Sequence, residues 1–135
     1  MDRAIQREKV AQAIHILRAQ DVDCWLTFVR ETSEQPDPVL KLTFGHDVTW
    51  QSAFILTKGG QRIAIVGRYD AEIVHEAGLY PTVRTYDAGI APVLLETIQQ
   101  GRARSPVWFS LFNTQRFPPH RTYAAWLTCP VEAPL

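Results

Sequence analysis

The sequence has no excess of charge of either sign, since 14 Lys and Arg residues balance 14 Asp and Glu residues. No overall electrostatic field therefore draws the chain to nucleic acid or to an anionic membrane. Residues 101–135 are the exception, with four arginines and a single acidic residue, Glu132. Four charges without a lysine-rich run are too few to indicate a nucleic-acid-binding arm. We expect neither nucleic acid nor membrane as a partner.

Cysteines are scarce, and long apolar runs are missing. Cys24 and Cys129 lie far apart without Cys-x-x-Cys spacing, and Cys24 sits in an apolar run where a small buried thiol is the usual finding. We expect both thiols to be unpaired. The first residues lack the apolar centre of a signal peptide, and no run approaches the ~18 apolar residues of a membrane span. These absences predict a cytoplasmic protein in a reducing compartment.

No catalytic motif is present. The four histidines, His15, His46, His75 and His120, include no pair at the i, i+4 spacing of a helical metal site. The serines lack the Gly-x-Ser-x-Gly elbow of hydrolases, and Lys58-Gly59-Gly60 lacks the phosphate-loop pattern. We therefore assign no catalytic residue, no metal ligand and no cofactor to this chain.

Alternating helix and strand patterns fill the 135 residues, a length that suits one domain. Apolar residues at helical spacing predict helices at 3–19, 38–44, 71–77 and 91–100. Runs rich in β-branched and aromatic residues predict strands at 22–29, 52–57, 61–66, 82–86 and 107–112. A further helix is expected to start within 122–127. The expected N-caps are Asp2, Asp37 and Asp70.

The stretch 50–87 is the most informative part of the chain. Two strands separated by Lys58-Gly59-Gly60 predict a hairpin with a tight turn. The helix and strand that follow predict a crossover, which favours an α/β fold over α+β. The strand at 22–29 is apolar almost throughout, so we expect it inside the sheet, covered on both faces.

The order of these elements and several local strings resemble a known family. The strings are the apolar strand 22–29, the short helix 38–45, and the hairpin strands 52–57 and 62–70. They are similar to the N-terminal domain of creatinase, prolidase and Xaa-Pro aminopeptidase, the pita-bread metallopeptidase group. The resemblance is strongest over residues 4–100, and the Arg- and Pro-rich end, 101–135, departs from it. It implies one domain, 1–135, of α/β class, with three layers and a mixed sheet flanked by helices, of ribonuclease-H-like type.

The resemblance also implies a function that depends on another domain. In the metallopeptidase members, a second domain supplies two Asp, one His and two Glu to a pair of divalent metals such as Mn or Co, while creatinase works without metal. This chain lacks that domain. The resemblance therefore implies a non-catalytic domain that helps dimerisation and shapes access to the active site of a metallopeptidase or creatinase-like hydrolase. Its expected partners are a second copy of itself or a pita-bread catalytic domain.

Two other functions remain open from the residues themselves. One is a stand-alone small-ligand-binding or enzymatic α/β module, with a site at the carboxyl ends of the strands near Arg30, His46 and Arg68. Arg30 opens a polar loop after an apolar strand, and the resemblance implies that it helps to bind a substrate carboxylate in a partner subunit. The other is a protein-interaction module. Four tryptophans are candidates for core or interface anchors, Trp25, Trp50, Trp108 and Trp126.

Overall fold

The computed structural model describes residues 3–34, 36–100 and 107–110. In chain order the elements are α1 (Ala4–Gln20), β1 (Cys24–Val29), α2 (Pro38–Thr43), β2 (Ser52–Thr57), β3 (Arg62–Gly67), α3 (Ala71–Ala77), β4 (Thr82–Tyr86), α4 (Ala91–Gln100) and β5 (Val107–Ser110). The predicted strand at 107–112 is thus found over its first four residues. The predicted helix within 122–127, and Cys129, lie outside the described residues.

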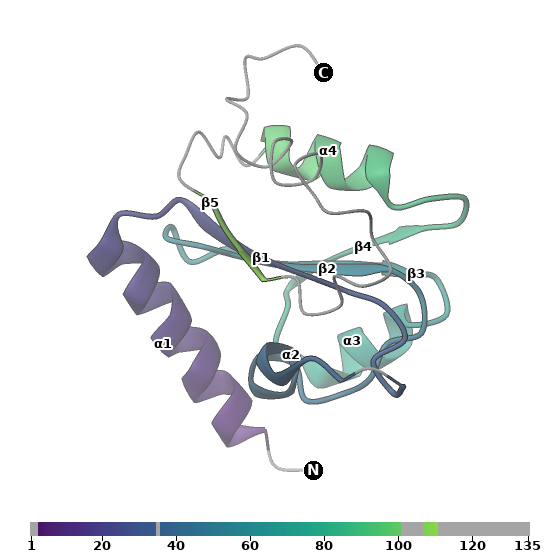
Figure 1. Ribbon diagram of the computed structural model, residues 1–135, viewed down its shortest axis with the longest axis horizontal. Coiled ribbons are helices and arrows are strands. Elements are labelled where there is room, and N and C mark those ends of the chain that lie inside the picture. Colours follow the sequence, from purple (N-terminus) through teal and green to yellow (C-terminus); the bar gives the residue numbers. More distant parts are fainter. Residues whose placement is uncertain (1–2, 35, 101–106, 111–135) are drawn as a thin grey trace.

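The strands form one mixed sheet in the order β4-β3-β2-β1-β5. β2 pairs antiparallel with β1 and β3, whereas β1–β5 and β3–β4 are parallel pairs. β1 lies inside the sheet, as its apolar sequence predicts, and the predicted hairpin and crossover are confirmed. α4 covers one face and α1, α2 and α3 cover the other, which confirms the expected three layers (Figure 1).

α1 packs through one apolar stripe, as its spacing predicts. The buried residues of this stripe are Val10, Ala13, Ile14 and Leu17. The prediction of Asp2 as N-cap is wrong, because Arg3 occupies that position. Its guanidinium donates a hydrogen bond to the carbonyl oxygen of Glu76 at 2.7 Å, which ties the beginning of α1 to α3.

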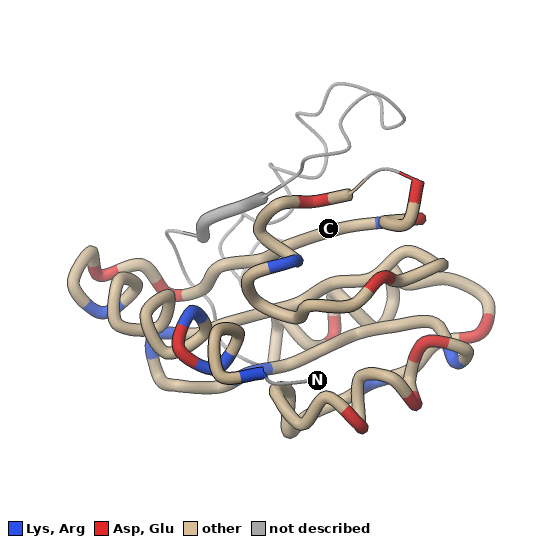
Figure 2. Tube along the Cα trace, turned by 90° about the horizontal axis from the view of Figure 1, so that it is seen from below, with Lys and Arg blue, Asp and Glu red and all other residues tan. Residues whose placement is uncertain are grey.

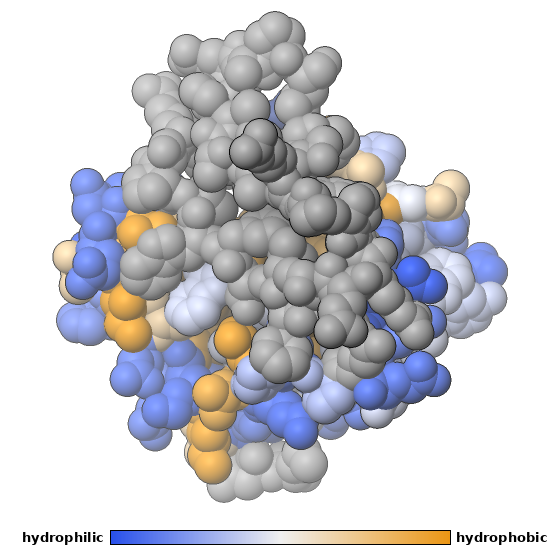
Figure 3. Space-filling view, viewed as in Figure 1, coloured by the Kyte–Doolittle hydropathy of each residue, from blue (hydrophilic) through white to orange (hydrophobic). Residues whose placement is uncertain are grey.

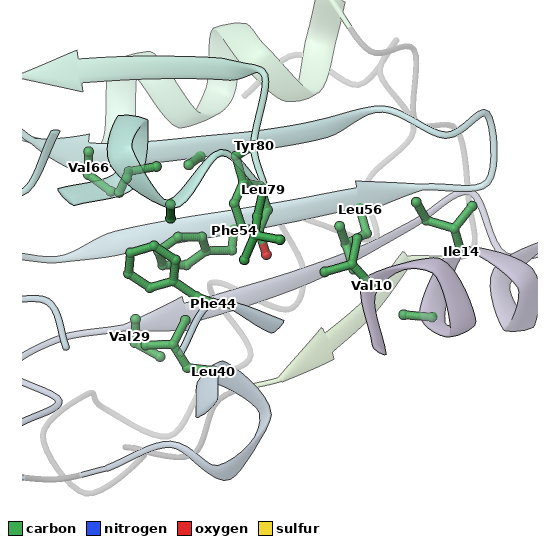
Figure 4. Close-up of a cluster of buried hydrophobic side chains, with 14 of the residues drawn as sticks. Val10, Ile14, Val29, Leu40, Phe44, Phe54, Leu56, Val66, Leu79 and Tyr80 are labelled. Carbon is green, nitrogen blue, oxygen red and sulfur yellow. The ribbon is translucent and has the colours of Figure 1, made fainter. Parts of the chain in front are cut away.

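The larger core lies between the sheet and α1, α2 and α3. Phe44, Phe54 and Tyr80 meet at its centre, with ring centroids 5.0 Å apart for Phe44 and Phe54 and 5.2 Å for Phe54 and Tyr80 (Figure 4). Each fully buried ring stabilises the fold by about 1.5–3 kcal/mol. The Tyr80 hydroxyl donates to the carbonyl oxygen of Thr43 at 3.1 Å, and burial raises the pKa of Tyr80 above its ordinary value.

Local sequence signals explain most element boundaries. The Asp37 carboxylate accepts hydrogen bonds from the amides of Val39 at 2.7 Å and Leu40 at 3.0 Å, so the predicted cap of α2 is confirmed. Gly78 ends α3 at φ 68°, in the left-handed region that favours glycine. β1 begins two residues later than predicted, because the Val22 amide is still bonded to the carbonyl oxygen of Leu17 at 2.9 Å.

Basic and acidic positions are interspersed along the described chain (Figure 2). On the face shown in Figure 3, most of the coloured surface is hydrophilic, and orange apolar patches lie over α1. Large apolar or aromatic side chains stand out to solvent at Ile5, Leu42 and Tyr69, and Tyr69 is the most exposed of these. Within the described residues, no helix has the length and apolarity to cross a membrane.

Candidate functional site

Several strand ends meet along one edge of the sheet. β1, β3 and β4 end there and β2 begins there, since Val29 pairs with Ser52 and Gly67 pairs with Tyr86. Aromatic and basic side chains are concentrated at this place. We call them the aromatic edge, which consists of Trp50, Tyr69 and Tyr86 with Arg30 and Arg68.

Trp50 contacts both tyrosine rings of the aromatic edge. The Trp50 and Tyr69 centroids lie 5.3 Å apart with their planes at 89°, and Trp50 and Tyr86 lie 6.0 Å apart at 36°. Edge-to-face and offset arrangements are those that aromatic pairs prefer. Trp50 also lies directly on the backbone of Gly67, where a β-carbon would come within 2.8 Å of the Trp50 Cδ2 atom. Any larger residue at 67 would therefore displace the indole ring.

A buried carboxylate holds the loop that carries Trp50. Asp70 is 7% exposed, and its oxygens accept hydrogen bonds from the amide of Thr49 at 3.1 Å and that of Trp50 at 3.2 Å. The prediction that the Asp70 side chain caps α3 is wrong, although Asp70 is the N-cap residue, because the carboxylate is used by this loop instead. Hydrogen bonds to a charged acceptor are stronger than neutral ones, so the loop is fixed firmly.

Tyr86 is held in place and kept neutral. Its hydroxyl donates to the carbonyl oxygen of Gln51 at 2.5 Å. Burial raises the pKa of Tyr86 to about 12, with a smaller contribution in the same direction from the Asp70 carboxylate and an opposing one from Arg30. At neutral pH the phenol is therefore a hydrogen-bond donor and not a base.

The two arginines of the aromatic edge are exposed to solvent. The Arg68 guanidinium lies 4.9 Å from the centre of the Tyr69 ring, donates to the Tyr69 hydroxyl at 2.9 Å and lies 3.5 Å from an Asp87 carboxylate oxygen. Arg30 follows the last residue of β1 and lies 3.6 Å from the Glu31 carboxylate. Arg30 and Arg68, two of the three site residues named from the sequence, thus follow strands that end at the same edge of the sheet.

His46 is placed elsewhere, between the beginning of α1 and the end of α2. An Arg3 guanidinium nitrogen lies 2.9 Å from His46 Nε2, and the Phe44 ring lies 5.4 Å from the imidazole in an edge-to-face contact. Arginine is only a donor, so Nε2 must be the acceptor in this contact. His46 therefore links α1 to α2 and does not contact the rings of the aromatic edge among the described residues.

The opposite end of the sheet carries a hollow of about 330 Å³ beside the hairpin turn. Cys24, Ile55 and Ile63 are among the residues that line it. Cys24 is a free, buried thiol, as predicted, and burial raises its pKa to about 12. A thiol that stays protonated at neutral pH is a poor nucleophile, so this hollow offers no cysteine chemistry.

The donor groups needed for a resident metal are not gathered in the part of the chain that the structure describes. In these ranges, no three His, Cys, Asp or Glu side chains lie close enough to hold a metal ion. Mn²⁺ or Co²⁺ of a peptidase centre requires a dense set of carboxylate and imidazole ligands. The described residues therefore do not fit such a metal pair.

No protein-family model matches the sequence, and no curated protein matches it either. Solved structures do match it. The N-terminal domain of an Xaa-Pro dipeptidase from Lactobacillus brevis superposes with a TM-score of 0.63 at 16% identity, over 90% of each chain. A dipeptidase from Mycobacterium ulcerans gives a TM-score of 0.65 at 18% identity over 96% of this chain. An X-Pro aminopeptidase from Thermotoga maritima gives 0.58 at 12% identity over 74% of this chain.

The chain has the fold of a creatinase/prolidase N-terminal domain. The resemblance read from the sequence is therefore confirmed at the level of the fold. The chain spans 34% of the Mycobacterium dipeptidase and 26% of the Thermotoga aminopeptidase. At these identities the likeness establishes the architecture, so activity, substrates and partners have to be argued from the residues.

Sequence reasoning missed part of the aromatic edge. Tyr69 and Tyr86 were not singled out, although each lies at or just after the carboxyl end of a predicted strand. The available signal was their position at strand ends. Tyr69 lies two residues after Gly67, and Gly67 pairs with Tyr86 where β3 and β4 run parallel. Trp50 was named only as a possible anchor, because nothing in a linear sequence shows that its ring lies on Gly67.

Proposed function

We propose that this chain is a non-catalytic N-terminal domain of an Xaa-Pro peptidase-like protein, which acts by packing. In this role it contributes to dimerisation and to the shape of the approach to an active site on a catalytic domain. The parent protein would be a metallopeptidase, or a creatinase-like hydrolase, and a divalent metal such as Mn²⁺ or Co²⁺ would belong to the catalytic domain. We also expect a cytoplasmic location.

The aromatic edge is the observation that supports a packing role most directly. Trp, Tyr and Arg are the residues most enriched at the centres of protein interfaces. Here Tyr69 is 68% exposed, yet its ring is already oriented by Trp50 and Arg68. Rings that are oriented in advance lose little conformational freedom when a partner binds. In our proposal, Arg30 and Arg68 meet carboxylates of the catalytic domain or of its bound peptide.

A peptidase assay of the purified 135-residue chain tests this function. The chain is incubated with Xaa-Pro dipeptides and Mn²⁺ or Co²⁺, and metal binding is measured by titration calorimetry. We expect no turnover and only weak, non-stoichiometric metal binding. A complete Xaa-Pro dipeptidase under the same conditions is the positive control. Robust turnover by the chain alone would show that it is an enzyme in its own right.

The coding sequence downstream of Leu135 gives a second test. A reading frame that continues into a domain with two Asp, one His and two Glu at metal-binding positions supports the proposal.

Coexpression with that domain is a third test, in which the chain should raise peptidase activity. The double variant Arg68→Gln, Tyr69→Ala should reduce this effect while the chain stays folded, because both side chains are exposed and the buried Asp70 still holds the Trp50 loop. Glu72→Gln, an exposed substitution on α3, is the matched control.

A stand-alone ligand-binding module is the second candidate, and the same edge favours it. Aromatic rings beside two arginines suit a small carboxylate with an apolar body. Titration of the chain with Xaa-Pro dipeptides, followed by tryptophan fluorescence, separates the two functions. Saturable quenching that disappears in Trp50→Phe and is not accompanied by turnover would favour this candidate over the packing role.

A further inference from the structure

β4 is the last strand at its end of the sheet. Its inner side pairs in parallel with β3, and among the described residues no strand pairs with its outer side. Thr82 and Thr85 are exposed. The outer backbone N–H and C=O groups of an edge strand are a template for another strand.

The sequence of β4 does little to prevent such pairing. Thr-Val-Arg-Thr-Tyr consists mainly of strand-favouring residues, and the strand contains no lysine, proline or glycine. Its one charge is neutralised within the chain. Arg84 lies 3.1 Å from the Glu96 carboxylate and donates to the Thr97 hydroxyl at 2.7 Å. Edge strands that must stay unpaired are normally protected by lysine, proline or a bulge.

We propose that the outer edge of β4 pairs antiparallel with β4 of a second copy of this chain, about a two-fold axis at Arg84. The two sheets then form one continuous sheet across the dimer. This pairing deepens the dimerisation part of the proposed function and rests on it. A two-fold contact uses the same surface on both copies, so the strand has to be complementary to itself.

Pairing about Arg84 meets this condition. Thr82 lies opposite Tyr86 of the second copy and Val83 lies opposite Thr85, and aromatic and β-branched residues stabilise such cross-strand pairs. Arg84 faces its own equivalent. Each guanidinium already has a Glu96 carboxylate beside it, so the centre of the contact contains two charges of each sign. A shift of the register by one residue would lose the symmetric pairing of Tyr86 with Thr82.

Disulfide trapping tests the register. At the centre of a two-fold antiparallel pair the two Cα atoms of residue 84 are about 4.5–5.5 Å apart, within the range of a disulfide. In a Cys129→Ser background, Arg84→Cys should give a covalent dimer under mild oxidation. Thr82→Cys is the matched control, because residues 82 of the two copies lie about 13 Å apart in this register. We expect the Thr82→Cys chain to remain monomeric on non-reducing gels.

A charge cycle tests the energetic argument independently of cysteine. Dimer dissociation is measured by analytical ultracentrifugation of the full chain. Glu96→Gln leaves two arginines facing each other without their counter-ions, so dimer affinity should fall by roughly threefold. The double variant Arg84→Gln, Glu96→Gln removes the repulsion and should regain most of the lost affinity. A purely structural effect of Glu96 within one chain would give no such recovery.

The outcomes separate this inference from the proposed function. A dimer that is trapped by Arg84→Cys and weakened by Glu96→Gln supports β4 pairing. A dimer that shows neither effect overturns β4 pairing while the dimerisation role stands. A chain that is monomeric at all concentrations overturns β4 pairing and the dimerisation role together. The non-catalytic assignment is decided separately, by the peptidase assay.

Discussion

Beside the aromatic edge the side chains of Asp70 and Tyr86 are held by backbone groups, whereas at the hairpin-turn end of the sheet the Lys58 side chain is held by ion pairs. Asp70 bonds two amides, and the Tyr86 hydroxyl bonds a carbonyl oxygen. At the turn end, Lys58 lies 2.9 Å from the Asp21 carboxylate and 3.1 Å from that of Asp23, close to solvent. The first arrangement holds side chains before any partner arrives, and the second is a set of ion pairs at the surface, with Asp21 exposed and Asp23 half-buried.

This difference suggests where the chain can bind. A binding surface needs groups whose orientation is already set, since ordering them on binding costs affinity. Exposed ion pairs contribute little, because water and salt screen them. Substitutions at the aromatic edge should therefore cost more stability than comparable ones at the turn end. Four substitutions test this, in order of decreasing effect.

Gly67→Val should have the largest effect. A β-carbon at 67 would lie 2.8 Å from the Trp50 Cδ2 atom, so the valine must displace the ring or bend β3. We expect a loss of about 2–3 kcal/mol in the free energy of unfolding, measured by urea denaturation. The matched control at the turn end is Gly59→Val, where the nearest atom to the new β-carbon is 3.7 Å away. Equal losses for the two variants would remove the contrast between the two ends.

Asp70→Ala should come next. The amides of Thr49 and Trp50 would lose their common acceptor within a loop that is partly buried. We expect a loss of about 2 kcal/mol, with increased mobility of Trp50 in fluorescence anisotropy. Asp21→Ala at the turn end, whose carboxylate is 89% exposed, should change stability by less than about 0.5 kcal/mol. An unchanged anisotropy in Asp70→Ala would mean that the loop does not depend on this carboxylate.

The fold was predictable from the sequence because its signals are local. Hairpin glycines, the Asp37-Pro38 cap and the apolar strand at 22–29 each act over a few residues. The aromatic edge was only partly predictable, because it forms where strands distant in the sequence come side by side. Arg30 and Arg68 can be placed at this edge from the sequence, because each follows a predicted strand. Asp70 was assigned to the wrong partner, since a capping position does not show that a loop twenty residues earlier will use the carboxylate.

Tyr86→Phe should cost about 1 kcal/mol at neutral pH, through the lost hydrogen bond to the Gln51 carbonyl oxygen. It should also change the alkaline limb of the stability curve. The pKa of Tyr86 is about 12 in the folded chain, above its ordinary value near 10, so its contribution is complete below pH 10 and is lost as the pH rises towards 12. The variant should therefore lose less stability than the parent between pH 10 and 12. Parallel curves for the two proteins would contradict this assignment.

Lys58→Gln, at the turn end, should have the smallest effect although it removes two ion pairs. Hydrogen bonds to Asp21 and Asp23 raise the pKa of Lys58, so the ammonium remains charged at neutral pH, but these contacts are open to solvent and salt. We expect the melting temperature to fall by no more than about 2 °C. In 0.5 M NaCl the difference between parent and variant should disappear, whereas the losses in Gly67→Val and Asp70→Ala should persist. A fall in Lys58→Gln as large as that in Asp70→Ala, and insensitive to salt, would show that the turn end is as firmly built as the aromatic edge.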